Sequence, residues 1–117
     1  DAIGDLVAER LRRLPEQYRI PLIDGREIVM VLGSPGDASR EFSHDLSDDE
    51  IMALTGNDPA DIIVCGASHV PFQRTVDEQH VVNVGSVGAA PEGRTAHYTI
   101  IRPQMSGAEI VQDWVEY

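Results

Sequence analysis

The feature that most constrains the fold is the stretch 61–72, where four apolar residues run directly into a glycine turn that carries a histidine. Ile62–Cys65 is too short for a helix and is typical of a strand covered on both faces. Gly66 ends the strand, and Pro71 keeps the residue before it out of the helical region. Loops at the ends of central strands carry the sites of layered α/β proteins, so we expect function here. His69 is then either a site residue or a side chain that only hydrogen-bonds a neighbouring carbonyl.

The totals favour one acidic domain, which we expect to span residues 1–117. The net charge of -11 comes from 20 acidic residues against 9 basic ones, and every basic residue is an arginine. A chain this acidic repels phosphate backbones and anionic lipid, so we expect neither nucleic acid nor a membrane as a partner. Cys65 lies inside the predicted strand and suits a small core residue in a reducing compartment. No signal peptide and no run of about 18 apolar residues is present, which predicts the cytoplasm.

Hydrophobic spacing predicts two helices. Apolar residues at positions 3, 7, 11 and 14 form one face of a helix that Pro15 ends. The chain starts at the edge of this helix without a methionine, so we expect that it was trimmed or cut from a longer one. Ser47 and Glu50 form a capping-box pattern ahead of a second, short helix, which the Gly56-Asn57 pair ends.

The remaining apolar runs predict strands. Residues 18–23 and 27–32 form a hairpin with a two-residue Asp24-Gly25 turn. A second hairpin joins residues 75–76 to 81–84, and the last pair is 96–102 with 108–117. A helix cap is available near the start of the final segment, but the alternation of apolar and polar residues that follows favours a strand.

Three loops that contain glycine follow apolar strands. They are Leu32-Gly33-Ser34-Pro35, Gly66-Ala67-Ser68-His69-Val70-Pro71-Phe72 and Asn83-Val84-Gly85-Ser86-Val87-Gly88. Their order resembles the calcineurin-like metallophosphoesterases, specifically the small bacterial and archaeal phosphodiesterase branch. The corresponding loops there contain His-Gly-Ser-Pro, Gly-His-Thr-His-x-Pro-Phe and Asn-Pro-Gly-Ser-Val-Gly. The resemblance runs from Leu14 to Tyr117 and implies the C-terminal half of an α/β fold, a layered β-rich half of the metallophosphoesterase β-sandwich with outer helices.

The resemblance also implies a depleted metal site. That family holds two divalent metals, such as manganese, nickel, iron or zinc, and uses them to hydrolyse phosphate esters. Leu32 and Ala67 stand where two of three expected histidines would be, so His69 alone remains as a metal-ligand candidate. One imidazole cannot hold a catalytic metal, which normally has three or more protein ligands. We therefore expect no metal cofactor and assign no catalytic residue.

The first-half motifs of that family, Asp-x-His, Gly-Asp and Gly-Asn-His, have no matching counterpart. Gly4-Asp5 lies on the first helix, and Gly56-Asn57-Asp58 falls on the wrong side of the Leu32 loop. Four further residues lie off the motifs and are expected on the surface: His44, Asp45, His80 and His97.

Two other uses of the three loops stay open. A serine hydrolase would need one of Ser34, Ser68 and Ser86 beside His69, with an acid such as Asp37, although no nucleophile-elbow pattern is present. An anion pocket would use backbone N–H groups and hydroxyls of these residues: Gly33, Ser34, Ser68, Gly85 and Ser86. Plain turn chemistry accounts for the same residues.

We therefore expect a degenerate metallophosphoesterase-like protein, without metal-dependent catalysis, that acts as a binding or assembly module. The alternative is part of an active metal-dependent phosphodiesterase or phosphatase whose other ligands come from upstream sequence or another chain. Half of the fold would leave apolar strand faces in water. We thus also expect a homodimer or larger homo-oligomer, or pairing with a complementary N-terminal half.

Overall fold

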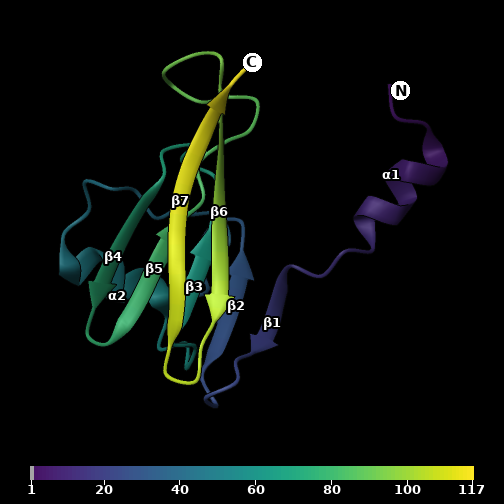
Figure 1. Cartoon of the computed structure of the whole chain (residues 1–117). Coiled ribbons are helices and arrows are strands. Elements are labelled where there is room, and N and C mark those ends of the chain that lie inside the picture. Colours follow the sequence, from purple (N-terminus) through teal and green to yellow (C-terminus); the bar gives the residue numbers. More distant parts are fainter. Residues whose placement is uncertain (1) are drawn as a thin grey trace.

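The computed structural model describes residues 2–117, which form two helices and two sheets (Figure 1). The helices are α1 (Asp5–Arg12) and α2 (Asp48–Thr55). The larger sheet contains β1 (Gln17–Pro21), β2 (Glu27–Val31), β3 (Ile62–Cys65), β4 (Phe72–Val76) and β5 (Gln79–Asn83). The smaller sheet is the hairpin of β6 (Thr95–Pro103) and β7 (Ala108–Glu116). The predicted α/β class with outer helices is confirmed.

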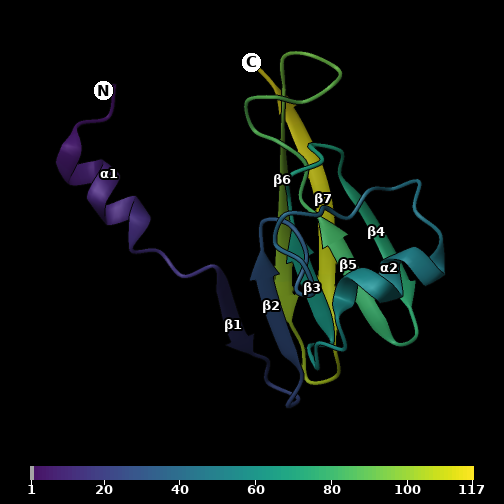
Figure 2. The same ribbon diagram turned by 180° about the vertical axis from the view of Figure 1, so that it is seen from behind.

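The strand order of the larger sheet is β1-β2-β3-β5-β4, with β2, β3 and β5 parallel and the two outer strands antiparallel to their neighbours. The hairpin β6–β7 covers one face of this sheet, and α2 covers the other (Figures 1 and 2). Because parallel strands end at the same edge, the loops that follow β2, β3 and β5 begin side by side.

Two hydrophobic clusters, one on each face, hold the layers together. The cluster on the α2 side contains Val29, Phe42, Ile51, Leu54, Ala60, Ile63, Cys65, Val76 and Val81. The cluster on the hairpin side contains Leu22, Ile28, Ile62, Val64 and Val82. All four residues of β3 are buried, as predicted for a strand covered on both faces. Burial raises the pKa of the Cys65 thiol to about 12, which fits the predicted small core residue.

The hairpin predictions are confirmed, with one correction to a turn. The link between β1 and β2 comprises residues 22–26 rather than two residues, since Pro21 pairs with Glu27. Leu22 lies just past the strand with its side chain buried in the core, and its N–H bonds the Arg26 carbonyl at 2.7 Å. The alternative helix after residue 105 is wrong, because β7 pairs with β6 from Ala108 onward.

Helix α2 begins and ends as the sequence predicts. The Ser47 hydroxyl accepts the Glu50 N–H, and the Glu50 carboxylate accepts the Ser47 N–H, which completes the capping box. Gly56 ends the helix in a left-handed conformation, with φ of 61°. Its backbone lies against Gly36 in the loop after β2, where a Cβ on Gly56 would come within 2.6 Å of the Gly36 Cα. Only glycine allows so close an approach.

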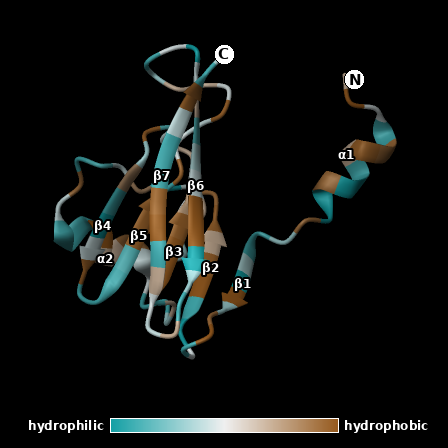
Figure 3. Ribbon diagram, in the orientation of Figure 1, coloured by the Kyte–Doolittle hydropathy of each residue, from teal (hydrophilic) through white to brown (hydrophobic). Residues whose placement is uncertain are grey.

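Helix α1 lies apart from both sheets (Figures 1 and 2) and packs against no other helix or strand of residues 2–117. Its amphipathic pattern is as predicted, and hydropathy colouring shows alternating bands along it (Figure 3). The apolar side chains nevertheless stay exposed, with Leu6 86% and Leu11 52% accessible. Neither α1 nor α2 has the length and apolar run that a bilayer crossing requires.

The turn after β3 adopts an unusual backbone. Ala67 and His69 both have left-handed conformations, with φ of 68° and 65°. This region disfavours residues that carry a Cβ, and such strain tends to occur at sites where a backbone is held for a purpose. The turn therefore carries a conformational cost at the place where the sequence predicts function.

Arg19 joins the edge strand β1 to the segment that precedes β3. Its guanidinium contacts the Asp58 carboxylate at 2.5 Å and the Glu27 carboxylate at 2.7 Å. The bonds from Arg19 hold the pKa of Asp58 below its ordinary value.

We predict that Ala67→Gly stabilises the protein by about 1 kcal/mol, because glycine adopts the left-handed conformation without steric cost. Urea denaturation measures the change. The matched control is Ala89→Gly, since Ala89 is exposed and not left-handed. It should lose about 0.4–1 kcal/mol through the entropy of the unfolded chain. If both variants changed the free energy of unfolding in the same direction, the strain assigned to Ala67 would be contradicted.

We predict that Arg19→Met lowers the free energy of unfolding at pH 7 and that this difference shrinks in acid, as the Asp58 carboxylate becomes protonated. The folded-state pKa of Asp58 lies below the ordinary value of about 3.9, so its contribution is complete at neutral pH. The contribution is lost as the pH falls through the folded value. Denaturation at pH 7 and pH 2.5 tests this, with Arg102→Met as control because that arginine forms a more exposed pair with Glu109. A difference that does not shrink between pH 7 and pH 2.5 would count against the ion pair.

Candidate functional site

The three predicted loops meet at the carboxyl edge of the parallel strands. The Gly66 N–H donates to the Leu32 carbonyl at 3.1 Å, which joins the first loop to the second. The Val84 N–H donates to the Cys65 carbonyl at 3.0 Å, which joins the end of β3 to the third loop. The structure therefore brings together the segments that the sequence singles out.

Asn83, the last residue of β5, is the anchor of this edge. Its side chain is fully buried, and its amide nitrogen donates to the Gly66 carbonyl at 2.9 Å and to the Ser68 hydroxyl at 2.8 Å. The same nitrogen lies 3.3 Å from the carbonyl of Phe42. Its amide oxygen accepts the Gly85 N–H at 3.0 Å. One side chain thus fixes the second and third loops relative to each other.

His97 holds the third loop from the side of the hairpin. The prediction that His97 lies on the surface is wrong, because it is only 6% exposed, between the hairpin and residues 85–86. Its Nδ1 accepts the Ser86 N–H at 3.2 Å, and its Nε2 pairs with the Glu92 carboxylate. The burial arises from tertiary packing that local sequence does not specify.

The donor groups at this edge do not fit a dinuclear metal centre. Leu32 is 73% exposed, Ala67 has no donor atom, and His69 is exposed at the end of the strained turn. Within residues 2–117 no group of three or more His, Cys, Asp or Glu side chains lies close enough to hold an ion. His69 is therefore a single potential ligand, where structural and catalytic sites use three or four.

The serine hydroxyls at this edge are engaged in turns. Ser34 donates to the Asp37 carbonyl at 2.7 Å, and Ser86 accepts the Ala89 N–H at 2.9 Å. Ser68 accepts from Asn83, and among residues 2–117 none of the three serines bonds to His69. This arrangement lacks the hydrogen bond between nucleophile and base that a serine hydrolase uses.

Three of the backbone donors proposed for an anion pocket are engaged. The N–H groups of Ser68, Gly85 and Ser86 bond to Gly66, Asn83 and His97 respectively. A Cβ on Gly33 would lie 2.5 Å from the carbonyl oxygen of Ala38, so an oxygen already faces that glycine. Anion binding at these residues stays a prediction.

The motif fragments outside the three loops lie elsewhere. Gly4 and Asp5 start α1, far from the sheet edge, and Gly56-Asn57 forms the end of α2. Asp58 binds Arg19 before β3, at the opposite edge from His69. His44 and Asp45 are exposed, as predicted.

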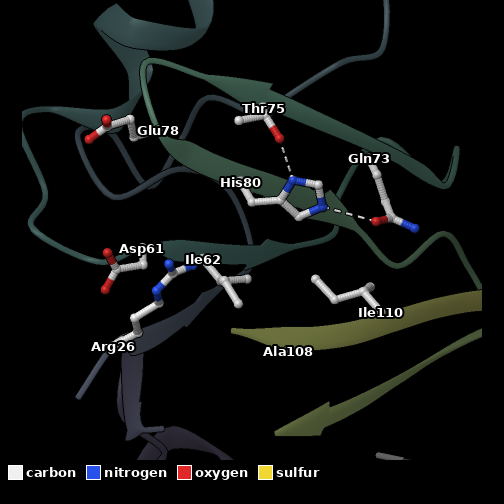
Figure 4. A pocket seen from close by; sticks show the side chains of 9 residues that line it. All are labelled: Arg26, Asp61, Ile62, Gln73, Thr75, Glu78, His80, Ala108 and Ile110. Atoms are coloured by element: carbon white, nitrogen blue, oxygen red, sulfur yellow. Dashed lines mark hydrogen bonds between the residues drawn. The ribbon is translucent and has the colours of Figure 1, made fainter. Parts of the chain in front are cut away.

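His80 is half-buried and lines a cavity of about 370 Å³ (Figure 4). Its Nδ1 lies 2.7 Å from the Thr75 hydroxyl and its Nε2 lies 2.9 Å from the Gln73 amide oxygen. Burial lowers the pKa of His80. Because the cavity also contains Asp61, which precedes β3, it lies at the edge opposite the three loops.

A second cavity, of about 590 Å³, lies between the end of α1 and the first loop. Its apolar lining includes Leu11, Leu14, Val31, Leu32 and Pro35. The position where the family resemblance implies a histidine is thus part of an apolar surface that continues onto α1. Sequence reasoning identified both segments but not their proximity.

The roles of two residues that shape the edge, Asn83 and His97, were not predicted from the sequence. Asn83 offers a usable signal, because an asparagine two residues before a glycine at a strand end is typical of a side-chain-capped turn. His97 offers none, since Ser86, the loop residue that it holds, lies 11 residues away in the chain.

Known proteins with similar sequences and structures agree with this fold. Residues 4–105 match the calcineurin-like phosphoesterase superfamily domain. A segment of 110 residues, 93% of the chain, is 34% identical to part of erythronolide synthase EryA2 from Saccharopolyspora erythraea and covers 3% of that protein.

Two solved structures are similar over 99% of the chain. Hypothetical protein PH1004 from Pyrococcus horikoshii OT3 has a TM-score of 0.82 at 23% identity, and a metallophosphoesterase from Sphaerobacter thermophilus has 0.78 at 18% identity. The chain spans 46% and 54% of these two proteins, about half of each. The loop order, the layered sheet and the match over residues 4–105 lead to one conclusion: the chain belongs to the calcineurin-like phosphoesterase superfamily.

Proposed function

We propose that this chain is a metallophosphoesterase-like module that does not assemble a metal centre from its own residues and acts by binding or assembly. The observation that carries the proposal is the donor set at the carboxyl edge, where Leu32 and Ala67 leave His69 as a single imidazole. A dinuclear centre needs several charged or imidazole ligands to offset the desolvation of two cations. Without them, the edge keeps its shape but not that chemistry.

The surface at this edge supports a binding role. The cavity between Leu32 and Leu11 has a mixed lining whose aliphatic side chains gain free energy when another apolar surface displaces water. An isolated helix as short as α1 is marginally stable in water, so a covering surface would stabilise it. Both features favour a macromolecular partner over a small phosphate ester.

The partner that we propose is a polypeptide with the complementary half of the fold, and a second copy of the chain is the alternative. The support is that the two solved structures match this chain almost completely, α1 included, yet are about twice as long. We also propose that the chain is the C-terminal half of that fold, a single domain over residues 1–117, and that it works in the cytoplasm. The buried free thiol of Cys65 suits that reducing compartment.

A second candidate function is part of an active metal-dependent phosphodiesterase or phosphatase. It is favoured by the strained backbone at His69. An exposed imidazole held on a strained turn suits a metal site whose other ligands come from another polypeptide. In that arrangement His69 would bind the metal, which would polarise the phosphate ester.

We predict that the purified chain binds no stoichiometric manganese, nickel or zinc and has no phosphodiesterase turnover. The double variant Leu32→His with Ala67→His should bind zinc at least about tenfold more tightly, because it raises the imidazoles at this edge to the number that a zinc site requires. Equilibrium dialysis with elemental analysis measures binding, and bis-p-nitrophenyl phosphate measures turnover. The control is Leu32→His alone.

Stoichiometric metal together with turnover in the unmodified chain would refute the proposed function. The second candidate makes a separate forecast, in which His69→Ala abolishes the activity of a reconstituted enzyme while leaving this chain folded. Circular dichroism of the variant checks the fold.

We predict that the chain by itself self-associates at micromolar concentration, because α1 and the neighbouring cavity expose apolar surface in the absence of a complementary half. Leu11→Asp should weaken the association at least about tenfold, since burying one leucine side chain is worth roughly 1.5–3 kcal/mol. Sedimentation equilibrium measures the effect, with Arg10→Gln on the polar face as control. A stable monomer, or an assembly that Leu11→Asp leaves intact, would contradict this use of α1.

A further inference from the structure

We propose that the outer edge of β7 is a binding site for an extended, positively charged polypeptide segment, which adds to the smaller sheet as a third strand. The site involves neither α1 nor the cavity at Leu32, so the inference does not rest on the proposed function.

The hydrogen bonds of the hairpin show which backbone groups of β7 face away from β6. At the two ends of the ladder, the Gln104 N–H donates to the Gly107 carbonyl at 3.1 Å and the Tyr117 N–H donates to the Arg94 carbonyl at 3.2 Å. Because bonded and non-bonded pairs alternate along an antiparallel ladder, every second residue of β7 directs its N–H and carbonyl to the outer edge. These residues are Ala108, Ile110, Gln112, Trp114 and Glu116.

The two outer edges of the hairpin differ in how far they are already used. On β6, the His97 N–H donates to the Ser86 carbonyl at 3.0 Å, and Pro103 has no N–H to offer. On β7, among residues 2–117, the Trp114 N–H is the one outward N–H with an acceptor, the Asp113 carboxylate at 2.8 Å. Strand β7 pairs with β6 over nine residues without a proline or a bulge, the features that commonly protect an edge. It is therefore open to a further strand.

Cavities border the same edge of β7. One, of about 370 Å³, is lined by Ala108 and Ile110 at the start of the strand and by His80 on the larger sheet (Figure 4). Two others, of about 260 and 440 Å³, are both lined by Trp114 near the end of the strand. Strands β4 and β5 lie on the side of β7 that faces away from β6 (Figures 1 and 2). A third strand would thus lie beside β7 and over the larger sheet.

The lining of these three cavities favours a positively charged segment. It contains two histidines, one guanidinium and five carboxylates, which are Arg26, Asp61, Glu78, Glu92, Asp113 and Glu116. Basic side chains at alternate positions of an added strand would face these carboxylates. The Trp114 side chain is 54% exposed and offers a ring face to a guanidinium.

The same charges disfavour a second copy of the chain at this edge. Its β7 would bring its own carboxylates, Glu109, Asp113 and Glu116, and its net charge of -11 has the same sign as the lining. An extended basic segment of another protein offers backbone groups to the edge and the opposite charge to the lining.

A fluorescent peptide of the length of β7, nine residues with arginine and valine in alternation, tests the proposal. We expect the whole chain to bind one peptide, measured by fluorescence anisotropy. The peptide with glutamate in place of arginine should not bind. Two further peptides carry methyl groups on the backbone nitrogens of all arginines or of all valines. Because an added strand bonds its neighbour through alternate residues, one of the two should lose binding and the other should keep it. Equal effects of the two methylations, or binding of the glutamate peptide, would overturn the proposal.

Two matched variants identify the edge. Ile110 and Ile101 lie opposite each other in the ladder, and their N–H groups face opposite edges. Ile110→Pro removes a donor from the β7 edge and should weaken peptide binding at least about fivefold. Ile101→Pro loses an equivalent side chain and alters the β6 edge, so affinity should stay within about twofold. Equal affinities of the two variants would place the peptide elsewhere and overturn the proposal.

A charge variant and an α1 variant separate this site from other surfaces. Glu78→Gln combined with Glu116→Gln should weaken binding about two- to tenfold, as expected for two exposed charge pairs. Loss of peptide binding in Leu11→Asp would show that the peptide occupies the apolar cavity beside α1, which would also overturn the proposal. If Ile110→Pro dissolves a self-associated form in sedimentation and no peptide binds, the edge is occupied by a second copy instead.

A measurement on the unmodified chain covers the case in which the proline variants do not fold. Saturation with the arginine–valine peptide should slow amide hydrogen exchange at Ile110 and Gln112, whose N–H groups face the edge. The Val111 amide, which faces β6, is the internal control and should change less. Unchanged exchange at Ile110 and Gln112 in the saturated chain would overturn the proposal without any substitution.

Discussion

The buried amide of Asn83 is the interaction on which the carboxyl edge of the sheet depends. It satisfies backbone groups of the second and third loops that would otherwise be left unpaired away from water. Each such group costs free energy comparable to a hydrogen bond when it has no partner. A single side chain at the end of β5 therefore does what a metal ion does in many sites, which is to draw separate loops to one point.

This support does not depend on which side chains occupy positions 32 and 67. The loops are positioned by Asn83, by backbone bonds from Gly66 and Val84, and by His97. None of these contacts involves the side chain of Leu32 or Ala67. Different side chains at those two positions would change the chemistry of the edge without removing any of these contacts. An aliphatic side chain at position 32 also joins the apolar surface that leads to α1.

Sequence reasoning located most of the fold because the relevant signals are local. The capping box of α2, the buried β3 and the alternation in β7 each arise from residues within a few positions of one another. The length of the β1–β2 connection was missed because Leu22 is drawn into a core formed by distant strands. At the candidate site, the three loops and the exposed His69 could be predicted, since parallel strands end together. The role of His97 could not, because its contact with Ser86 is set by packing between the hairpin and the sheet, whereas Asn83 offers the local signal of an asparagine two residues before a glycine.

The contact between Gly36 and Gly56 has a mechanical consequence. The first loop and the end of α2 touch backbone to backbone, and the Gly36 N–H also bonds the Leu54 carbonyl at 3.0 Å. Side chains at such a junction could absorb small relative movements of the two elements by changing rotamer. Gly36 and Gly56 have no side chains to adjust, so a displacement of α2 along the sheet would also displace the loop that carries Leu32. The position of α2 on one face of the sheet is thereby coupled to the position of the first loop at its carboxyl edge.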